Sequence, residues 1–216
     1  FLDDTDNRPL IAIDNLGLFM PAEGGFSWIC DEALTPFPGL NVVQFMPVPG
    51  LFLAGTRNGL YRAQRDGCHF QPVGGELNEH VVGRILSPDP SSPSNTVLTT
   101  QTLGRPNDVY WTDSGGEMWN PVGLDIRGRV RSIIRSDSNP ARVYAIHSEG
   151  ALKSDDGGRT FMPIRLERGE TMLTPTDVSL LATSPQLVDT LYAVNEGFPQ
   201  STLIISRNAG ETWTDV

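Results

Sequence analysis

The chain has very little lysine and cysteine, and it has no long apolar run. Lys153 is the only lysine among 216 residues, and Cys30 and Cys68 are the only cysteines. No apolar stretch reaches the roughly 20 residues that a helix needs to cross a bilayer. We therefore expect no direct membrane insertion, and two cysteines are too few to form a disulfide framework.

Positive charge and metal-ligand spacing are also scarce. The formal net charge is −10 at pH 7, and a nucleic-acid partner would need a basic face to neutralise phosphates. The three histidines, His69, His80 and His147, are far apart and lack the spacing of a metal site. The sequence therefore predicts no nucleic-acid partner, no metal site and no cofactor.

A helical repeat of apolar residues is absent as well. The chain instead contains 22 glycines and 17 prolines, which break helices and favour turns. Between them lie short runs rich in β-branched and aromatic residues, which are typical of strands. This pattern predicts an all-β fold.

One short motif recurs five times. Its clearest copies are residues 154–161 and 206–213, which both read Ser-x-Asp/Asn-x-Gly-x-Thr-aromatic. The copies recur at roughly 40 to 50 residues, which indicates stacked supersecondary units. The aromatic residues that close them are Trp28, Phe70, Trp119, Phe161 and Trp213.

Each copy lies between two strand-length runs, and two further runs precede it. Ser and Asp side chains bond to nearby backbone N–H groups and Gly adopts positive φ, so the motif predicts a turn between the third and fourth strands. Four antiparallel strands at this period are typical of a β-propeller blade. We expect a single domain over 1–216, belonging to a longer chain and with its ring incomplete at both ends. The expected blades are approximately 1–31, 41–73, 81–122, 130–164 and 178–216.

The motif resembles the Asp box, or BNR repeat, of the sialidase-like and sortilin-like superfamily. Residues 59–63 and 152–161 are similar to the copies found in sortilin-type receptors, xyloglucan-degrading endoglucanases and photosystem II assembly factors. The resemblance implies a propeller fold and a structural role for the motif, and it implies no activity. Three copies depart from the pattern, at Glu23, Arg65, Ser114 and Met118.

The two cysteines fall at comparable places in neighbouring repeats. Cys30 follows the first copy of the motif, and Cys68 lies inside the second. Both should lie near the same rim, one blade apart. They form either a disulfide, which would indicate an oxidising compartment, or two separate thiols.

The alternating direction of the strands indicates which loops could form a binding site. Loops between the second and third strands share one face with the loops that join successive blades, and long loops tend to hold functional residues. The longest is 165–177. Our candidate binding residues on this face are Arg57, Asn58, Arg105, Glu149, Glu196 and Arg168.

The sequence patterns that would indicate catalytic residues are weaker than those that indicate a binding surface. A glycoside hydrolase needs two carboxylates at a set separation. Asp14, Glu149 and Glu196 occupy equivalent loop positions, and Phe37 and Phe198 are the loop aromatics that could stack on sugar rings. The Phe-Arg-Ile-Pro motif of sialidases is absent.

We therefore assign no catalytic residue. The leading hypothesis is a non-catalytic propeller that is secreted, surface-associated or periplasmic and binds a protein or glycan partner. The alternative is a propeller glycoside hydrolase with part of its paired-carboxylate site outside this chain. A third possibility is a structural subunit of a larger assembly that makes its contacts along the outer strands.

Overall fold

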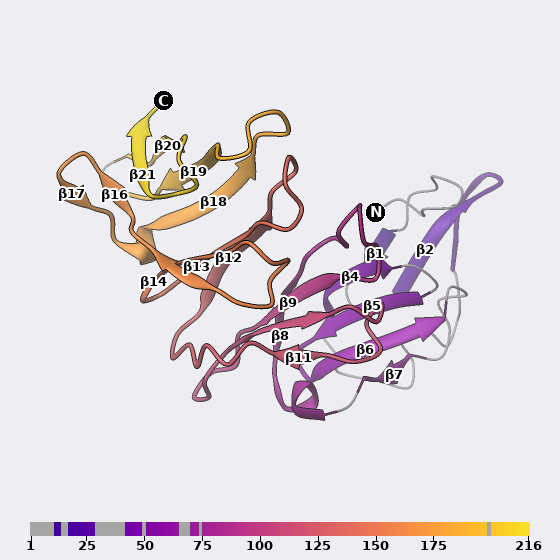
Figure 1. Cartoon of the computed structure of the whole chain (residues 1–216). Coiled ribbons are helices and arrows are strands. Elements are labelled where there is room, and N and C mark those ends of the chain that lie inside the picture. Colours follow the sequence, from indigo (N-terminus) through magenta and orange to yellow (C-terminus); the bar gives the residue numbers. More distant parts are fainter. Residues whose placement is uncertain are drawn as a thin grey trace. The chain divides into compact units, whose positions relative to one another are not determined.

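The computed structural model describes residues 11–13, 17–28, 42–48, 51–64, 70–73, 75–197 and 200–216 (Figure 1). The described residues form β-strands and two short 3-10 helices, η1 (Gly75–Glu79) and η2 (Pro175–Asp177), and they contain no α-helix. The all-β prediction is confirmed. Five sheets repeat along the chain, and consecutive strands are neighbours in each of them except for β17 and β18, which lie at opposite edges of the fifth sheet.

The strands follow the predicted four-strand repeat. The first sheet has three described strands, β1 (Ile11–Ile13), β2 (Gly17–Ala22) and β3 (Gly25–Trp28). The second contains β4 (Val42–Val48), β5 (Leu51–Thr56), β6 (Gly59–Gln64) and β7 (Gln71–Pro72). The third contains β8 (Val82–Ile85), β9 (Thr96–Thr100), β10 (Val109–Thr112) and β11 (Asn120–Pro121).

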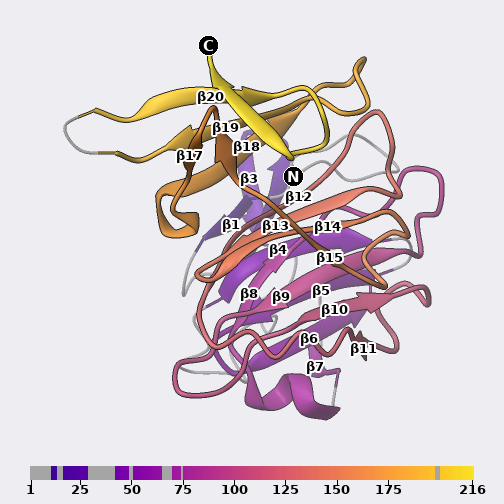
Figure 2. The ribbon, with the colours of Figure 1, turned by 60° about the vertical axis from the view of Figure 1, so that its left-hand side comes forward.

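The remaining strands form the fourth and fifth sheets, which lie side by side in sequence order (Figure 2). The fourth contains β12 (Val130–Arg135), β13 (Val143–His147), β14 (Gly150–Ser154) and β15 (Met162–Ile164). The fifth contains β18 (Val178–Thr183), β19 (Leu191–Asn195), β20 (Thr202–Ser206) and β21 (Thr212–Asp215).

The chain divides into two compact units. Unit 1 comprises residues 1–88, 92–98 and 112–119, and unit 2 comprises 89–91, 99–111 and 120–216. The third sheet contributes strands to both units. The fourth and fifth sheets lie wholly in unit 2, which holds most of the loops considered below.

The motif forms a self-bonded turn in its clearest copy. The Ser154 hydroxyl accepts a bond from the Gly158 N–H at 2.9 Å and donates one to Asp156 at 2.7 Å. The Asp156 carboxylate accepts from the N–H and the hydroxyl of Thr160, at 2.9 and 2.6 Å. Side chains therefore satisfy the polar backbone of the turn, as the motif predicts.

The other described turns repeat this arrangement with different residues. In the last copy, Ser206 bonds to the Gly210 N–H at 2.9 Å, and Asn208 accepts from the Thr212 N–H at 3.0 Å. In the third copy, Thr112 takes the place of the serine. Ser114 takes the place of the acid, and its hydroxyl accepts from the Met118 N–H at 2.8 Å. A hydroxyl therefore substitutes for a carboxylate, and the turn persists without the acid.

The first copy differs from the motif-based prediction. β2 continues to Ala22 and β3 begins at Gly25, so that the turn contains only Glu23 and Gly24. This copy has Pro21 where the third, fourth and fifth copies have a hydroxyl residue. Proline cannot supply the hydroxyl acceptor that Ser154 provides in its own turn, and in the first copy the two strands pair directly with each other. Most of the second copy, residues 65–69, lies outside the described residues.

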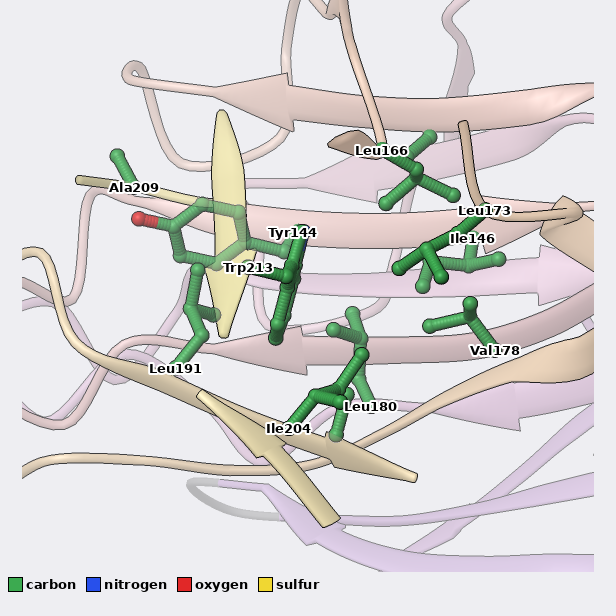
Figure 3. Packing of buried hydrophobic residues seen from close by; sticks show 12 residues of the cluster. Tyr144, Ile146, Leu166, Leu173, Val178, Leu180, Leu191, Ile204, Ala209 and Trp213 are labelled. Carbon is green, nitrogen blue, oxygen red and sulfur yellow. The ribbon is translucent and has the colours of Figure 1, made fainter. Parts of the chain in front are cut away.

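The core of unit 2 lies between the fourth and fifth sheets. Figure 3 shows Trp213 beside Tyr144, with Leu191 and Ile204 close by. Trp213 and Tyr144 are each only 1% exposed. The Trp213 indole N–H donates to the Gly210 carbonyl at 3.0 Å. The aromatic that closes the motif therefore packs into the core and also fixes the turn.

The longest predicted loop is ordered as a hairpin. Within residues 165–177, β16 (Glu167–Arg168) and β17 (Thr171–Met172) pair with each other, and β16 also pairs in parallel with β21. Leu166 and Leu173 flank the hairpin and join the core cluster. The fifth sheet thus has six strands, in the order β17-β16-β21-β20-β19-β18.

We expect the self-bonded turns to make unit 2 sensitive to acid. Partial burial by itself raises the pKa of Asp156, but hydrogen bonds from Thr160, Ser154 and the Arg159 N–H outweigh it and lower the pKa. A lowered pKa means that this stabilisation is present above the carboxyl's unfolded value, near pH 4, and is lost as the pH falls through the folded value. Urea unfolding of Asp156→Asn and the wild type between pH 2 and 7 should show a stability difference that shrinks on acidification. A difference that is constant across this range would contradict the prediction.

Candidate functional site

Loops from three sheets are joined by hydrogen bonds along one face of unit 2. Asn107 and Ile126 exchange backbone hydrogen bonds of 2.7 and 2.8 Å, and the Ser148 N–H donates to the Arg129 carbonyl at 3.1 Å. The Glu196 N–H donates to the Asp177 carbonyl at 2.6 Å. We call this set the loop face and define it as residues 101–108, 122–131, 147–149, 177–179 and 195–197.

Asn107 fixes the loop between β9 and β10. Its side chain, with the residue only 3% exposed, accepts from the Thr102 N–H at 2.5 Å and donates to the Thr102 carbonyl at 3.2 Å. It also donates to the Gly128 carbonyl at 2.9 Å. One buried amide therefore closes its own loop and attaches it to the next one.

We expect Asn107→Ala to destabilise unit 2 by about 2 to 3 kcal/mol, because half-buried backbone groups of Thr102 and Gly128 would lose three hydrogen bonds to this amide. Leu103→Ala in the same loop is the control. Leu103 is 81% exposed, and a surface substitution of this kind should change stability by less than about 0.5 kcal/mol. Urea unfolding followed by circular dichroism measures both. Equal losses for the two variants would show that the amide does not hold the loop.

Asp108 organises the loop that follows β11. Its carboxylate accepts from the N–H groups of Gly123 at 2.7 Å and Leu124 at 3.0 Å. A third bond comes from the Val109 N–H at 2.8 Å. This carboxylate is therefore occupied by backbone donors, which gives it a structural role.

Gly128 allows two loops to approach closely. A Cβ atom at this position would lie 1.7 Å from the Ser148 hydroxyl oxygen and 2.7 Å from the Ser148 Cβ. Any larger residue would push the β13–β14 turn away from the β11–β12 loop. The glycine is therefore required for the loops to join here.

An ion pair links the fourth and fifth sheets on the loop face. Arg131 lies where the β12–β13 register shifts, a bulge that redirects its side chain. It donates to Glu196 at 3.0 Å, and the Ser179 hydroxyl donates to the same carboxylate at 2.9 Å. The hydrogen bond from Ser179, and then the bond and charge of Arg131, lower the pKa of Glu196.

His147 and Glu149 lie at the turn between β13 and β14. Burial lowers the pKa of His147, and the negative charge of Glu149 opposes this shift. The Glu149 N–H donates to His147 Nδ1 at 3.4 Å. A lowered pKa leaves the imidazole neutral at physiological pH, so it acts here as a hydrogen-bond acceptor.

The loop face displays a mixed set of side chains to solvent. Leu103 is 81% exposed. Arg105, Arg127, Arg129 and Glu149 are also exposed. The described residues of the loop face include no aromatic side chain. The surface thus combines one apolar anchor with charges of both signs.

Three of the six predicted binding residues lie in the loops that define the loop face. Arg105, Glu149 and Glu196 all belong to the loop face of unit 2. Arg57 and Asn58 form the β5–β6 turn in unit 1, where the Asn58 N–H donates to the Thr56 hydroxyl at 3.0 Å.

Arg168, the sixth predicted residue, lies on β16. It pairs with Asp215 at 3.2 Å, with a longer bond of 3.5 Å to the Thr202 hydroxyl. Asp14, Phe37 and Phe198, which the hydrolase alternative requires, lie outside the described residues. So do Cys30 and Cys68.

Sequence reasoning missed five contributors to the loop face. Asn107 and Ser179 carry no motif, and their roles depend on partners in other loops. A signal for the arginines was present, because Arg127, Arg129 and Arg131 alternate with Gly128 and Val130. Alternation of this kind is typical of a strand with one exposed side.

Two absences among the described residues bear on the site. The described residues contain no group of three or more His, Cys, Asp or Glu that could hold a metal ion. Among the same residues, no helix has the length and apolar character that crossing a membrane requires.

Solved structures with a similar fold include enzymes and a peptide-binding protein. An ancestral GH74 enzyme has a TM-score of 0.70 and 19% identity, covering 100% of this chain and 30% of that chain. The GH74 xyloglucanase from Xanthomonas campestris has a TM-score of 0.70 and 13% identity, covering 99% of this chain and 38% of that chain. YCF48, solved bound to D1 peptide, has a TM-score of 0.60 and 15% identity, covering 100% of this chain and 69% of that chain.

The similarity concerns the fold alone. No protein-family model matches the chain, and no curated protein matches it in sequence. The chain spans about a third of the length of the two GH74 enzymes. Together with the repeated four-stranded antiparallel sheets, these neighbours identify the fold as a β-propeller.

Proposed function

We propose that this chain is the binding part of a non-catalytic β-propeller that works as an assembly scaffold. The loop face of unit 2 is the proposed binding surface. The self-bonded turns are Asp boxes in this proposal and serve as structural corners. We further propose that 1–216 belong to one propeller domain of a longer protein.

The observation that most supports this proposal is the prearranged loop face. Asn107, Asp108 and Gly128 hold neighbouring loops together through main-chain contacts. A surface that is already ordered loses little conformational entropy when a partner binds. The same loops display several arginines, and arginine is enriched where proteins bind each other.

The charge state of Glu196 speaks against a role as a general acid. A glycoside hydrolase needs one carboxyl group with a raised pKa to protonate the leaving oxygen. The pKa of Glu196 is lowered instead, and both of its oxygens are occupied by Arg131 and Ser179. Asp108 is likewise occupied, by backbone N–H groups.

A protein partner fits the loop face better than a glycan. Sugar rings stack on aromatic side chains, and the described loop face has none. An exposed leucine beside arginines suits a protein surface with an apolar pocket and acidic residues at its rim. We place the protein outside the cell, at the cell surface or in the periplasm. In support, one solved structure of similar fold is the extracellular domain of BT4673 from B. thetaiotaomicron, with a TM-score of 0.63.

The second candidate function is a glycoside hydrolase, and the similarity to GH74 enzymes favours it. It requires that this chain supply one carboxylate, such as Glu149 or Glu196, to a site completed elsewhere. Incubation with xyloglucan and measurement of new reducing ends tests it. Activity that Glu149→Gln or Glu196→Gln removes would establish the hydrolase and overturn the scaffold.

A charge-reversal experiment tests the scaffold. A photo-crosslinking residue at position 103 should capture a discrete partner in an envelope extract of the source organism, and mass spectrometry then identifies it. With the purified partner, Arg127→Glu/Arg129→Glu should weaken binding by at least about tenfold. Arg207→Glu, an exposed arginine in the last motif turn, is the matched control and should change binding by less than about threefold. Equal effects of the two variants, or no adduct at position 103, would contradict the proposal.

A further inference from the structure

Three outer strands carry a proline at the same register. Pro72 in β7 lies opposite Tyr61, Pro121 in β11 lies opposite Tyr110, and Pro163 in β15 lies opposite Leu152. Each proline is the second residue after the aromatic that closes a motif. Each of these strands is also the last one in its sheet.

The nitrogen of these prolines faces the open edge. The next residue donates inward, as shown by Val73 N–H to the Leu60 carbonyl and Val122 N–H to the Val109 carbonyl, each at 2.9 Å. Successive N–H groups of a strand point to opposite sides, so the preceding nitrogen points outward. Proline has no N–H there, which removes a donor that an added strand would need.

β21 lacks this proline. Asp215 occupies the equivalent register opposite Ile204, and the Val216 N–H donates inward to the Leu203 carbonyl at 3.2 Å. The N–H groups of Asp215 and Trp213 therefore face outward. β16 lies along this edge, with Glu167 opposite Thr212 and Arg168 opposite Trp213.

The hairpin that supplies β16 is firmly anchored. Leu166 is 2% exposed and Leu173 is 8% exposed, and both pack in the core cluster with Trp213. The Leu173 N–H donates to the Leu166 carbonyl at 2.7 Å, which closes the base of the hairpin. The ion pair between Arg168 and Asp215 fastens it to the end of β21.

We propose that the β16–β17 hairpin is a built-in cover for a strand-addition edge on β21. Without it, β21 would pair with β21 of a second copy of this chain. A two-fold contact of this kind needs only one self-complementary edge and gives an antiparallel pair. With the hairpin in place the outermost strand is β17, which has two residues and is a poor template for pairing.

This inference concerns self-association and goes beyond the proposed function. It also bears on the third sequence-based possibility, contact along the outer strands. Prolines at the edges of β7, β11 and β15 oppose such contact by strand addition in those sheets. Among the last strands of the four sheets with at least four described strands, β21 is the one without such a proline.

Replacing residues 167–172 with six glycine and serine residues uncovers the edge and keeps Leu166 and Leu173. We expect that the wild type does not dimerise through this edge. The replacement variant should form a dimer whose population rises with concentration, as measured by sedimentation equilibrium. Near-ultraviolet circular dichroism of the four tryptophans, which include the buried Trp213, reports whether the core is retained. Should this variant fail to fold, Glu167→Pro keeps the rest of the hairpin, removes the β16 N–H that faces β21, and should shift the chain toward the dimer to a smaller extent.

Asp215→Pro provides the decisive control. It copies Pro163 at the same register, so β21 should tolerate it in the sheet while losing an outward donor in each copy. In the background of the replacement variant, or of Glu167→Pro, it should weaken the dimer by more than about tenfold. Dimerisation that Asp215→Pro reverses supports the proposal. An uncovered variant that stays monomeric, or a dimer that Asp215→Pro leaves intact, overturns it.

Discussion

Trp213→Ala is expected to lower the free energy of unfolding of unit 2 by about 3 to 5 kcal/mol, the range found for removing a buried tryptophan. Trp213 is 1% exposed and lies at the centre of the cluster between the fourth and fifth sheets. Its indole N–H also satisfies the Gly210 carbonyl. The substitution therefore leaves a cavity and removes a hydrogen bond inside a motif turn.

Trp119→Ala is the matched control for this prediction. Trp119 occupies the same place in the third motif and makes the equivalent bond to the Gly116 carbonyl at 3.1 Å, but its side chain is only half-buried. Because less apolar surface is lost, we expect a cost of about 1 to 2 kcal/mol. Urea unfolding followed by far-ultraviolet circular dichroism compares the two. A cost for Trp213→Ala no larger than that of Trp119→Ala would show that burial in the cluster is not decisive.

Gly210→Ala should destabilise the chain by about 2 to 4 kcal/mol, because two separate penalties add there. Its φ is +88°, a conformation that residues with a Cβ rarely adopt. A Cβ atom would also lie 2.8 Å from Ile164 Cδ1 and 3.4 Å from Leu191 Cδ1. The backbone would be strained and the core would have to shift.

Gly157→Ala separates these two penalties. Gly157 also has a positive φ, +81°, but no atom lies within 4 Å of the position that its Cβ would take. The equivalent residue of the last motif is Ala209, which already has a φ of +60°. We therefore expect a cost of about 1 kcal/mol from backbone strain alone. Similar losses of stability in the two variants, measured by the same urea unfolding, would argue against a steric role for the packed glycine.

The sheets and the turns could be predicted because they depend on local chemistry. Strand-length apolar runs specify each strand, and the hydroxyl and acidic residues of the motif bond within eight residues of chain. The third copy of the motif shows that local chemistry predicts the turn even where the sequence departs from the motif. Ser114 lacks a carboxylate, yet its hydroxyl makes the required bond. The first copy marks the limit, because Pro21 removes the hydroxyl on which the turn depends.

The site could be predicted only in part. Alternating strand direction was enough to place Arg105, Glu149 and Glu196 in loops of the same face. Their partners could not be predicted, because Arg131 and Glu196 are 65 residues apart in the chain. The parallel pairing of β16 with β21 also joins residues that are far apart in the sequence, so it could not be predicted. Arg168 was therefore predicted to be a binding residue on a loop. Its ion pair with Asp215 spans 47 residues.

The closure of the β9–β10 loop by Asn107 has a consequence for how this surface could diversify. The bonds of the amide go to main-chain atoms of Thr102 and Gly128, so they do not depend on which side chains lie between. Substitutions at the tip, such as at Leu103, can therefore change the exposed surface while the frame stays constant. If the loop face binds a partner as proposed, this loop can change its partner without a change of fold, and it is a suitable position for inserting a foreign epitope.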